Sequence, residues 1–195
     1  MPERLQARSA LAGVYRVGRT GANPGGEAGV TVCERRGLAI VHLAGDEGDA
    51  AFLGAAEEWL GLSLPRVANT AASAGAWTAL WLGPGRWLLV AAGRETERAA
   101  DALRGALGPA PGAVTDVGSG RTVLRIAGPN GVDVLAAGSP LDLHARRFAP
   151  DQCAQSAIAG INVLIHKLDP SPRLDVFVAR SYAVTFWDWL GDAAA

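Results

Sequence analysis

Apolar residues recur along this chain with two different periods, and each change of period predicts a new element of secondary structure. Residues 38–43 form a nearly continuous apolar run, which is typical of a buried strand. Residues 49–60 place apolar side chains at helical spacing and therefore predict a helix with one apolar face. Residues 77–92 predict a β-hairpin, because two apolar runs meet at the turn sequence Gly-Pro-Gly-Arg of residues 83–86.

The first strand of this hairpin is apolar on both of its faces. Trp77, Ala79 and Trp81 alternate onto one face, while Leu80 and Leu82 fall on the other. Such a strand predicts a sheet that is covered on both sides.

A similar order of elements then follows in the second half of the chain. The first half ends with a predicted helix at 94–107 and a short strand at 114–117. The second half predicts a strand, a short helix, a hairpin, a strand and a final helix at residues 122–126, 130–137, 154–168, 174–179 and 181–190. The pattern indicates an α+β fold made of two tandem β-α-β-β-type units with antiparallel sheets.

This repeat suggests how the chain is divided. We expect a single α+β domain at residues 37–195 made of two pseudo-repeated halves, at about 37–118 and 119–195. Residues 1–36 are weakly periodic and carry a glycine-rich run, so we expect an N-terminal arm there.

Composition and charge exclude several classes of function. Hydrophobic residues make up 49% of the chain and charged residues 19%, which is typical of a globular protein. The net charge of -1, with Lys167 as the only lysine, argues against nucleic-acid binding. No apolar run is long enough to span a bilayer, the first residues lack the apolar stretch of a signal peptide, and the cysteines are too few for a disulfide framework. We therefore expect a cytoplasmic protein that binds neither nucleic acid nor membrane.

Residue types that carry out catalysis are sparse and poorly spaced. His144, His166 and Cys153 do not occur at paired metal-ligand spacing. His166 lies in an apolar strand, where we expect a hydrogen-bonded structural histidine, and Cys153 is expected to be a small buried hydrophobe. The sequence predicts no catalytic, cofactor-binding or metal-binding residue in this chain.

Residues 141–156 read Leu-Asp-Leu-His-Ala-Arg-Arg-Phe-Ala-Pro-Asp-Gln-Cys-Ala-Gln-Ser. This segment resembles the most distinctive stretch of the sarcosine oxidase gamma-subunit family. Residues 9–13, 80–87 and 178–183 resemble the same family in the same order. The departures are Ala145, where the family favours proline, and Ser156, where it favours threonine.

The resemblance implies a non-catalytic gamma subunit of heterotetrameric sarcosine oxidase, which supports assembly with alpha, beta and delta subunits. That complex oxidatively demethylates sarcosine to glycine, formaldehyde or methylene-tetrahydrofolate, and hydrogen peroxide. The resemblance also implies that FAD, FMN, NAD, tetrahydrofolate and zinc are carried by the other subunits. It further implies a fold similar to the folate-binding domain of glycine-cleavage aminomethyltransferases.

Basic and aromatic residues of the C-terminal half are candidates for a subunit interface. His144, Arg146, Arg147 and Phe148 follow a predicted helix on a connection that we expect to be exposed, where arginines can pair with carboxylates and an aromatic side chain can fill a pocket. Tyr182 and Trp187 add aromatic surface near the final helix. The alternatives are ion pairs of Arg146 or Arg147 with Asp142 or Asp151 in the same loop, and aromatic packing within the domain.

Three other functions remain open on the sequence. A stand-alone folate-binding or aminomethyltransferase-like protein would need an arginine and a carboxylate, for which Asp116, Arg121, Arg146 and Arg180 are available. The equivalent subunit of an N-methylglutamate dehydrogenase-type complex would share many features of the chain. A hydrolase or transferase dependent on Cys153 is the third.

Overall fold

Two antiparallel sheets form the framework of the protein in a computed structural model that describes residues 8–15, 18–22, 28–93 and 98–195. The six-stranded sheet, called sheet A, has the order β1 (Gly18–Ala22), β2 (Ala28–Arg35), β8 (Arg121–Ala127), β11 (Arg173–Ala179), β10 (Ile161–Lys167) and β9 (Cys153–Ile158). The five-stranded sheet, called sheet B, has the order β4 (Ala71–Ala74), β5 (Trp77–Gly83), β6 (Arg86–Ala92), β3 (Leu38–Gly45) and β7 (Gly112–Asp116). The mixed α+β class with antiparallel sheets is confirmed.

The two sheets match each other strand by strand. From β9 to β2, sheet A repeats the order in which sheet B runs from β4 to β7. The chain crosses between the sheets twice, because β2 leads into β3, and β7 leads into β8 through the 3-10 turn η2 (Gly118–Gly120). Strand β2 of sheet A is therefore followed along the chain by β3 of sheet B, and β7 of sheet B is followed by β8 of sheet A.

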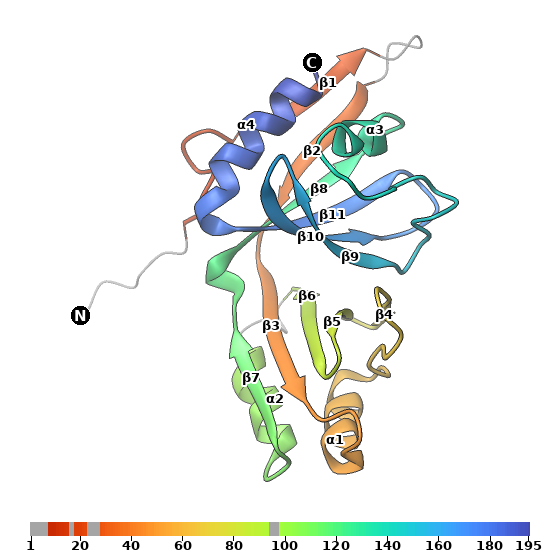
Figure 1. Cartoon of the computed structure of the whole chain (residues 1–195). Helices are drawn as coiled ribbons and strands as arrows, with labels where there is room; N and C mark the ends of the chain where they lie inside the picture. The colour runs from red at the N-terminus through yellow and green to blue at the C-terminus, as the bar shows by residue number, and fades with distance from the viewer. Residues whose placement is uncertain (1–7, 16–17, 23–27, 94–97) are drawn as a thin grey trace, which may run out of the picture.

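Helices cover the outer face of each sheet, as Figure 1 shows. Helices α1 (Ala50–Leu60) and α2 (Ala99–Leu107) pack on sheet B around Phe52, Trp87 and Leu103. Helices α3 (Gly131–Ala136) and α4 (Ala183–Ala193), the latter following the 3-10 turn η3 (Arg180–Tyr182), pack on sheet A. The inner faces of the sheets meet in a third apolar cluster, which has the buried members Ile40, Leu80, Leu88, Val90, Val123, Cys153, Leu164 and Phe177.

The hairpin of β5 and β6 has the two apolar faces that its sequence predicted. Trp77 and Ala79 point into the outer cluster of sheet B, while Leu80 points to the inner one. Trp81 was expected on the face of Trp77 and Ala79. Its register agrees with that face, because it lies opposite Trp87 of the outer cluster, but its partly buried side chain packs against the inner cluster. Strand pairing becomes irregular just beyond it, between Trp81 and Gly83.

The segment expected as an arm contributes to sheet A. In β2, Val30 and Val32 are buried against the helices, and the strand pairs with β8 over Thr31 to Arg35. Leu11 is also buried in the same outer cluster. The alternation of apolar residues in this segment is short and follows a glycine-rich run. The strand could therefore be recognised only from its pairing with β8. The exact bounds of the two halves, 37–118 and 119–195, stay a prediction.

The turn between β5 and β6 contacts the end of β3 and provides a test of this packing. Gly85 has φ +64, and a Cβ placed there would lie 2.3 Å from the Gly45 carbonyl oxygen. Gly75 also has positive φ, but a Cβ there would meet nothing within 4 Å. We expect Gly85→Ala to lower the free energy of unfolding by clearly more than Gly75→Ala, for which only the left-handed backbone costs about 1–2 kcal/mol. Urea unfolding measures both variants, and equal losses would contradict the close contact.

Candidate functional site

The connection between α3 and β9 forms a compact turn around His144. The His144 carbonyl accepts hydrogen bonds from the backbone N–H groups of Arg147 and Phe148, at 2.8 and 2.9 Å. The His144 ring accepts one from the Arg146 N–H through Nδ1, at 3.2 Å. These bonds hold the backbone and leave the side chains of His144, Arg146 and Arg147 exposed.

The two arginines of this turn have no ionic partner in the part of the chain that the structure describes. No carboxylate lies within 4.0 Å of either guanidinium there, so the local pairs with Asp142 or Asp151 do not form. Asp142 instead accepts a hydrogen bond from the His144 N–H at 3.0 Å. Arg146 and Arg147 are therefore available to a partner.

Phe148 does not belong to this exposed surface. Only 5% of the residue is exposed, and it packs in the outer cluster of sheet A with Leu143. The expectation that Phe148 is exposed for a partner is wrong. Burial of an aromatic side chain in the chain's own core outweighs the polar character of its neighbours.

The aromatic residues near the C-terminus divide between surface and core. Tyr182 is 54% exposed. Trp187 is half-buried, and its ring centroid lies 5.2 Å from that of Tyr15. Trp189 packs on Phe186 at 5.7 Å between ring centroids. Much of the aromatic excess of α4 is thus used within this chain, and Tyr182 is the aromatic residue of the candidate interface that remains on the surface.

A row of polar residues crosses the inner face of sheet A. Asp175, only 2% exposed, binds Arg125 through both carboxylate oxygens at 2.8 and 2.9 Å and Arg35 at 2.9 Å. His166 lies opposite Asp175 on the neighbouring strand, and Cys153 lies opposite His166. Sequence reasoning did not find this row, because its members come from different strands and meet only through their register.

Burial decides the protonation of the cysteine and the histidine in this row. The Cys153 thiol donates to the carbonyls of Thr70 and Trp81 at 3.3 and 3.5 Å, and burial raises its pKa to about 11. A thiol that stays protonated at neutral pH is a poor nucleophile. Burial lowers the pKa of His166, so its neutral form is favoured. Its Nε2 finds no hydrogen-bond partner among the described residues, so the expectation of a hydrogen-bonded histidine is not met at this atom.

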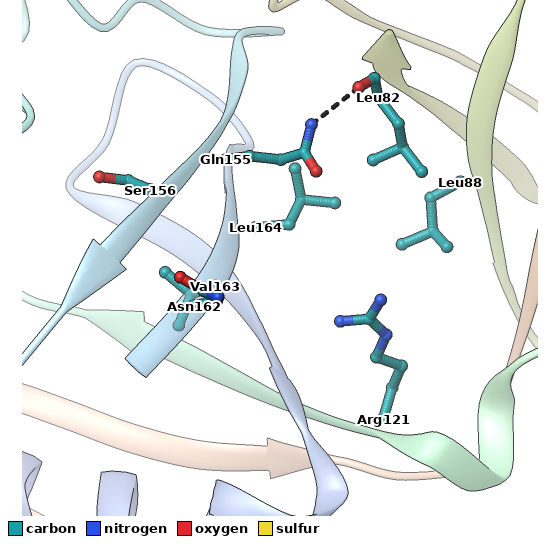
Figure 2. Close-up of a pocket in the computed structure, with 8 residues that line it drawn as sticks. All are labelled: Leu82, Leu88, Arg121, Gln155, Ser156, Asn162, Val163 and Leu164. Atoms are coloured by element: carbon teal, nitrogen blue, oxygen red, sulfur yellow. Dashed lines mark hydrogen bonds between the residues drawn. The ribbon is translucent and has the colours of Figure 1, made fainter. Parts of the chain in front are cut away.

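A pocket of about 430 Å³ opens between the two sheets (Figure 2). Leu82 and Leu88 line it from sheet B, and Gln155 and Leu164 line it from sheet A. The Gln155 amide donates to the Leu82 carbonyl at 2.8 Å and so links the sheets across the pocket. The Arg121 guanidinium points toward Leu88 and Leu164.

A second hollow of about 690 Å³ lies where the chain crosses between the sheets, and we call it the crossover groove. Residues 37–40 and Val123 are among those that line it, and its charged lining residues are Arg8, Glu34, Arg35, Arg36, Asp116, Arg121 and Arg180. The structure thus brings together three of the residues considered for folate, namely Asp116, Arg121 and Arg180, but places Arg146 on a different connection. Sequence reasoning missed Arg8, Arg35 and Arg36, which fall in the segment taken as an arm.

Metal-binding and membrane-spanning features are both absent within the described residues. No group of three or more His, Cys, Asp or Glu side chains is placed to hold a metal ion in that part of the chain. No helix formed by the same residues is long and apolar enough to cross a bilayer.

Comparison with known proteins decides the family. The family model described as "Sarcosine oxidase, gamma subunit family" matches residues 44–195. The chain belongs to the sarcosine oxidase gamma subunit family. It is 34% identical over 169 residues to the sarcosine oxidase subunit gamma of Corynebacterium sp. (strain U-96), which covers 85% of this chain and 80% of the relative. It is 36% identical over 129 residues to the subunit gamma of an Arthrobacter sp., covering 66% of this chain and 61% of that relative.

Solved structures agree with this family assignment. A chain of the heterotetrameric sarcosine oxidase from Corynebacterium sp. U-96, in complex with pyrrole 2-carboxylate, matches with a TM-score of 0.81 and 28% identity, covering 96% of this chain and 94% of that chain. The glycine cleavage system aminomethyltransferase T from Bartonella henselae matches with a TM-score of 0.61 and 14% identity, covering 82% of this chain and 44% of that chain. The second match concerns the fold alone, and it confirms the expected likeness to the aminomethyltransferases.

The burial of Phe148 is tested by truncation. We expect Phe148→Ala to lower the free energy of unfolding by about 3–5 kcal/mol, because it opens a cavity in the outer cluster of sheet A. Arg147→Ala is the matched control, and it should change stability by less than about 0.5 kcal/mol because the side chain is exposed. Chemical unfolding checks both, and two small effects would contradict the buried position of Phe148.

The buried imidazole of His166 predicts a pH dependence of stability. Its pKa is lowered in the folded protein from 6.5, first by burial and next by the positive charges of Arg125 and Arg35, against the opposing effect of Asp175 and Asp151. Below pH 6.5 the unfolded chain binds the proton more readily than the folded one, so stability falls as the pH falls. In urea unfolding between about pH 7.5 and 5.5, His166→Leu should weaken this slope. The exposed control His144→Leu should retain it, and an unchanged slope in His166→Leu would contradict the assignment.

Proposed function

We propose that this chain is the gamma subunit of a heterotetrameric sarcosine oxidase. Its role is to help the complex assemble, and it carries out no chemical step itself. The match to a chain of the Corynebacterium complex carries this proposal. It extends over 96% of this chain at a TM-score of 0.81, and its 28% identity is well above that of the aminomethyltransferase. Alpha, beta and delta subunits are the proposed partners, and sarcosine is the proposed amine of the whole complex.

The state of the titratable groups supports a non-catalytic role. Cys153 is buried with a raised pKa, which argues against a cysteine-dependent hydrolase or transferase. Asp175 is engaged by two arginines, and His166 is enclosed between the sheets with only 4% of the residue exposed. We propose that FAD, FMN, NAD, tetrahydrofolate and zinc are bound by the other subunits. The cytoplasmic location stays a prediction.

The exposed face of the connection between α3 and β9 is the proposed interface. Arg146 and Arg147 project from a turn whose backbone hydrogen bonds hold it in one shape. A guanidinium without an internal partner can form a bidentate pair with a partner carboxylate without first breaking an ion pair of its own. His144, Tyr182 and the exposed part of Trp187 remain in the proposed interface set, whereas Phe148 is removed from it.

One observation favours folate binding as a second candidate function. The crossover groove contains Asp116, Arg121 and Arg180, which offer a carboxylate for a pterin and cations for a glutamate tail. Calorimetry of the isolated chain with tetrahydrofolate tests this function. Stoichiometric binding that is lost in Asp116→Asn would favour it over the assembly role, and no heat of binding would reject it.

The assembly role predicts a specific effect of charge reversal. When the chain is produced together with alpha, beta and delta subunits, Arg146→Glu/Arg147→Glu should lower the yield of the four-subunit complex by about tenfold, since two exposed ion pairs become repulsive. Native mass spectrometry measures the yield, and turnover of sarcosine against N-methylglutamate identifies the amine. Arg66→Glu is the control, because Arg66 is also exposed and only weakly paired, 3.8 Å from Glu57. A wild-type chain that never joins a flavoprotein would overturn the proposed function itself.

A further inference from the structure

The crossover groove is a consequence of the topology. Strand β2 leaves sheet A and continues as β3 in sheet B, while β7 leaves sheet B and continues through η2 as β8 in sheet A (Figure 1). Both crossings lie side by side, since Val117 donates its N–H to the Ile40 carbonyl at 2.9 Å. The groove runs along these crossings and is bordered by Arg180 of η3 and by residues 8–10.

Some charges of the groove are already balanced within the chain. Arg35 is paired with Asp175, which Arg125 also binds. Arg36 is paired with Glu34 at 2.6 Å and lies over the Tyr15 ring, 5.1 Å from its centroid. Because Arg35 and Arg36 are already paired with carboxylates, they line the groove without adding an unpaired positive charge to it.

The remaining cations of the groove have no carboxylate partner among the residues that the structure describes. Arg180 donates to the Arg8 backbone carbonyl at 2.7 Å, a neutral acceptor. Neither Arg8 nor Arg121 forms an ion pair within the same residues. The carboxylate of Asp116 accepts a hydrogen bond from the Gly118 N–H at 2.8 Å and pairs with neither arginine. The whole chain has a net charge of -1, so this excess of positive charge is local to the groove.

The walls of the groove suit an extended chain better than a small molecule. Arg8, Arg36, Arg121, Ser119 and Arg180 are all exposed, whereas a small ligand is usually enclosed over most of its surface. At Gly37, with φ +68, a side chain would meet nothing within 4 Å, so the backbone there lies open. An approaching peptide backbone would find room beside the half-buried Leu38.

We propose that the crossover groove binds an extended acidic segment of a partner subunit, whose Asp or Glu side chains pair with Arg8, with Arg180 and with Arg121, which borders both this groove and the pocket between the sheets. This inference rests on the proposed function, because it assumes the partner subunits. The groove is then a second contact surface, built by η2, η3 and the crossing strands. The first contact surface is the connection between α3 and β9, which carries Arg146 and Arg147. Complementary charge at such a site would select the correct partner and speed the encounter.

The test compares charge-reversal variants of this chain in the intact complex. Arg121→Glu/Arg180→Glu should lower the affinity of the chain for the remaining subunits by about tenfold at low salt, and it should flatten the salt dependence of that affinity. The exposed control Arg66→Glu should leave both values unchanged. Urea unfolding of each variant alone excludes misfolding as the cause, since both groove arginines are exposed.

A peptide arm of the experiment identifies the ligand class. A hexaglutamate peptide should bind the wild-type chain in a salt-sensitive manner and should not bind Arg121→Glu/Arg180→Glu. If the wild-type chain assembles and the groove variant assembles with equal affinity and salt dependence, the groove proposal is overturned while the proposed function stands. Displacement of the peptide by tetrahydrofolate at stoichiometric concentration would also overturn it, in favour of a small-molecule site.

Discussion

The contact between the inner faces of the two sheets is the interaction on which the rest of this structure depends. Each sheet has two apolar faces, and helices cover only the outer one. The inner faces leave water only by packing on each other through residues such as Leu88, Leu164 and Phe177. Because β2 leads into β3 and β7 leads into β8, the chain crosses this contact twice, and sheet A combines β1 and β2 from the N-terminal segment with β8 to β11 from the C-terminal part of the chain.

Burial between the sheets also sets the chemical state of the Cys, His and Asp side chains that lie in one row. Low polarity favours the neutral thiol of Cys153 and the neutral imidazole of His166. The one charge in the row, Asp175, is balanced by Arg125 from β8 and Arg35 from β2. That arrangement ties the segment that precedes β3 into sheet A, since removing either arginine would leave a buried carboxylate poorly compensated.

The same crossings place several arginines at the surface. Arginines that face the interior are paired, whereas Arg121 and Arg180 in the groove and Arg146 and Arg147 on the connection after α3 have no carboxylate partner among the described residues. A subunit whose reactive groups are enclosed and whose unpaired cations lie outside is suited to assembly. This division agrees with membership of the gamma subunit family.

Local patterns in the sequence were sufficient for most elements, for the α+β class and for the family. The helix at Ala50–Leu60, for example, begins at Asp49, whose side chain accepts from the N–H groups of Ala51 and Phe52, and ends at Gly61 in the left-handed conformation. Only the tertiary structure placed β2 in sheet A, buried Phe148 and brought Asp175 to Arg35 and Arg125. Periodicity and capping act between residues a few positions apart, whereas these features depend on strand register and on contacts as distant as the 140 positions between Arg35 and Asp175.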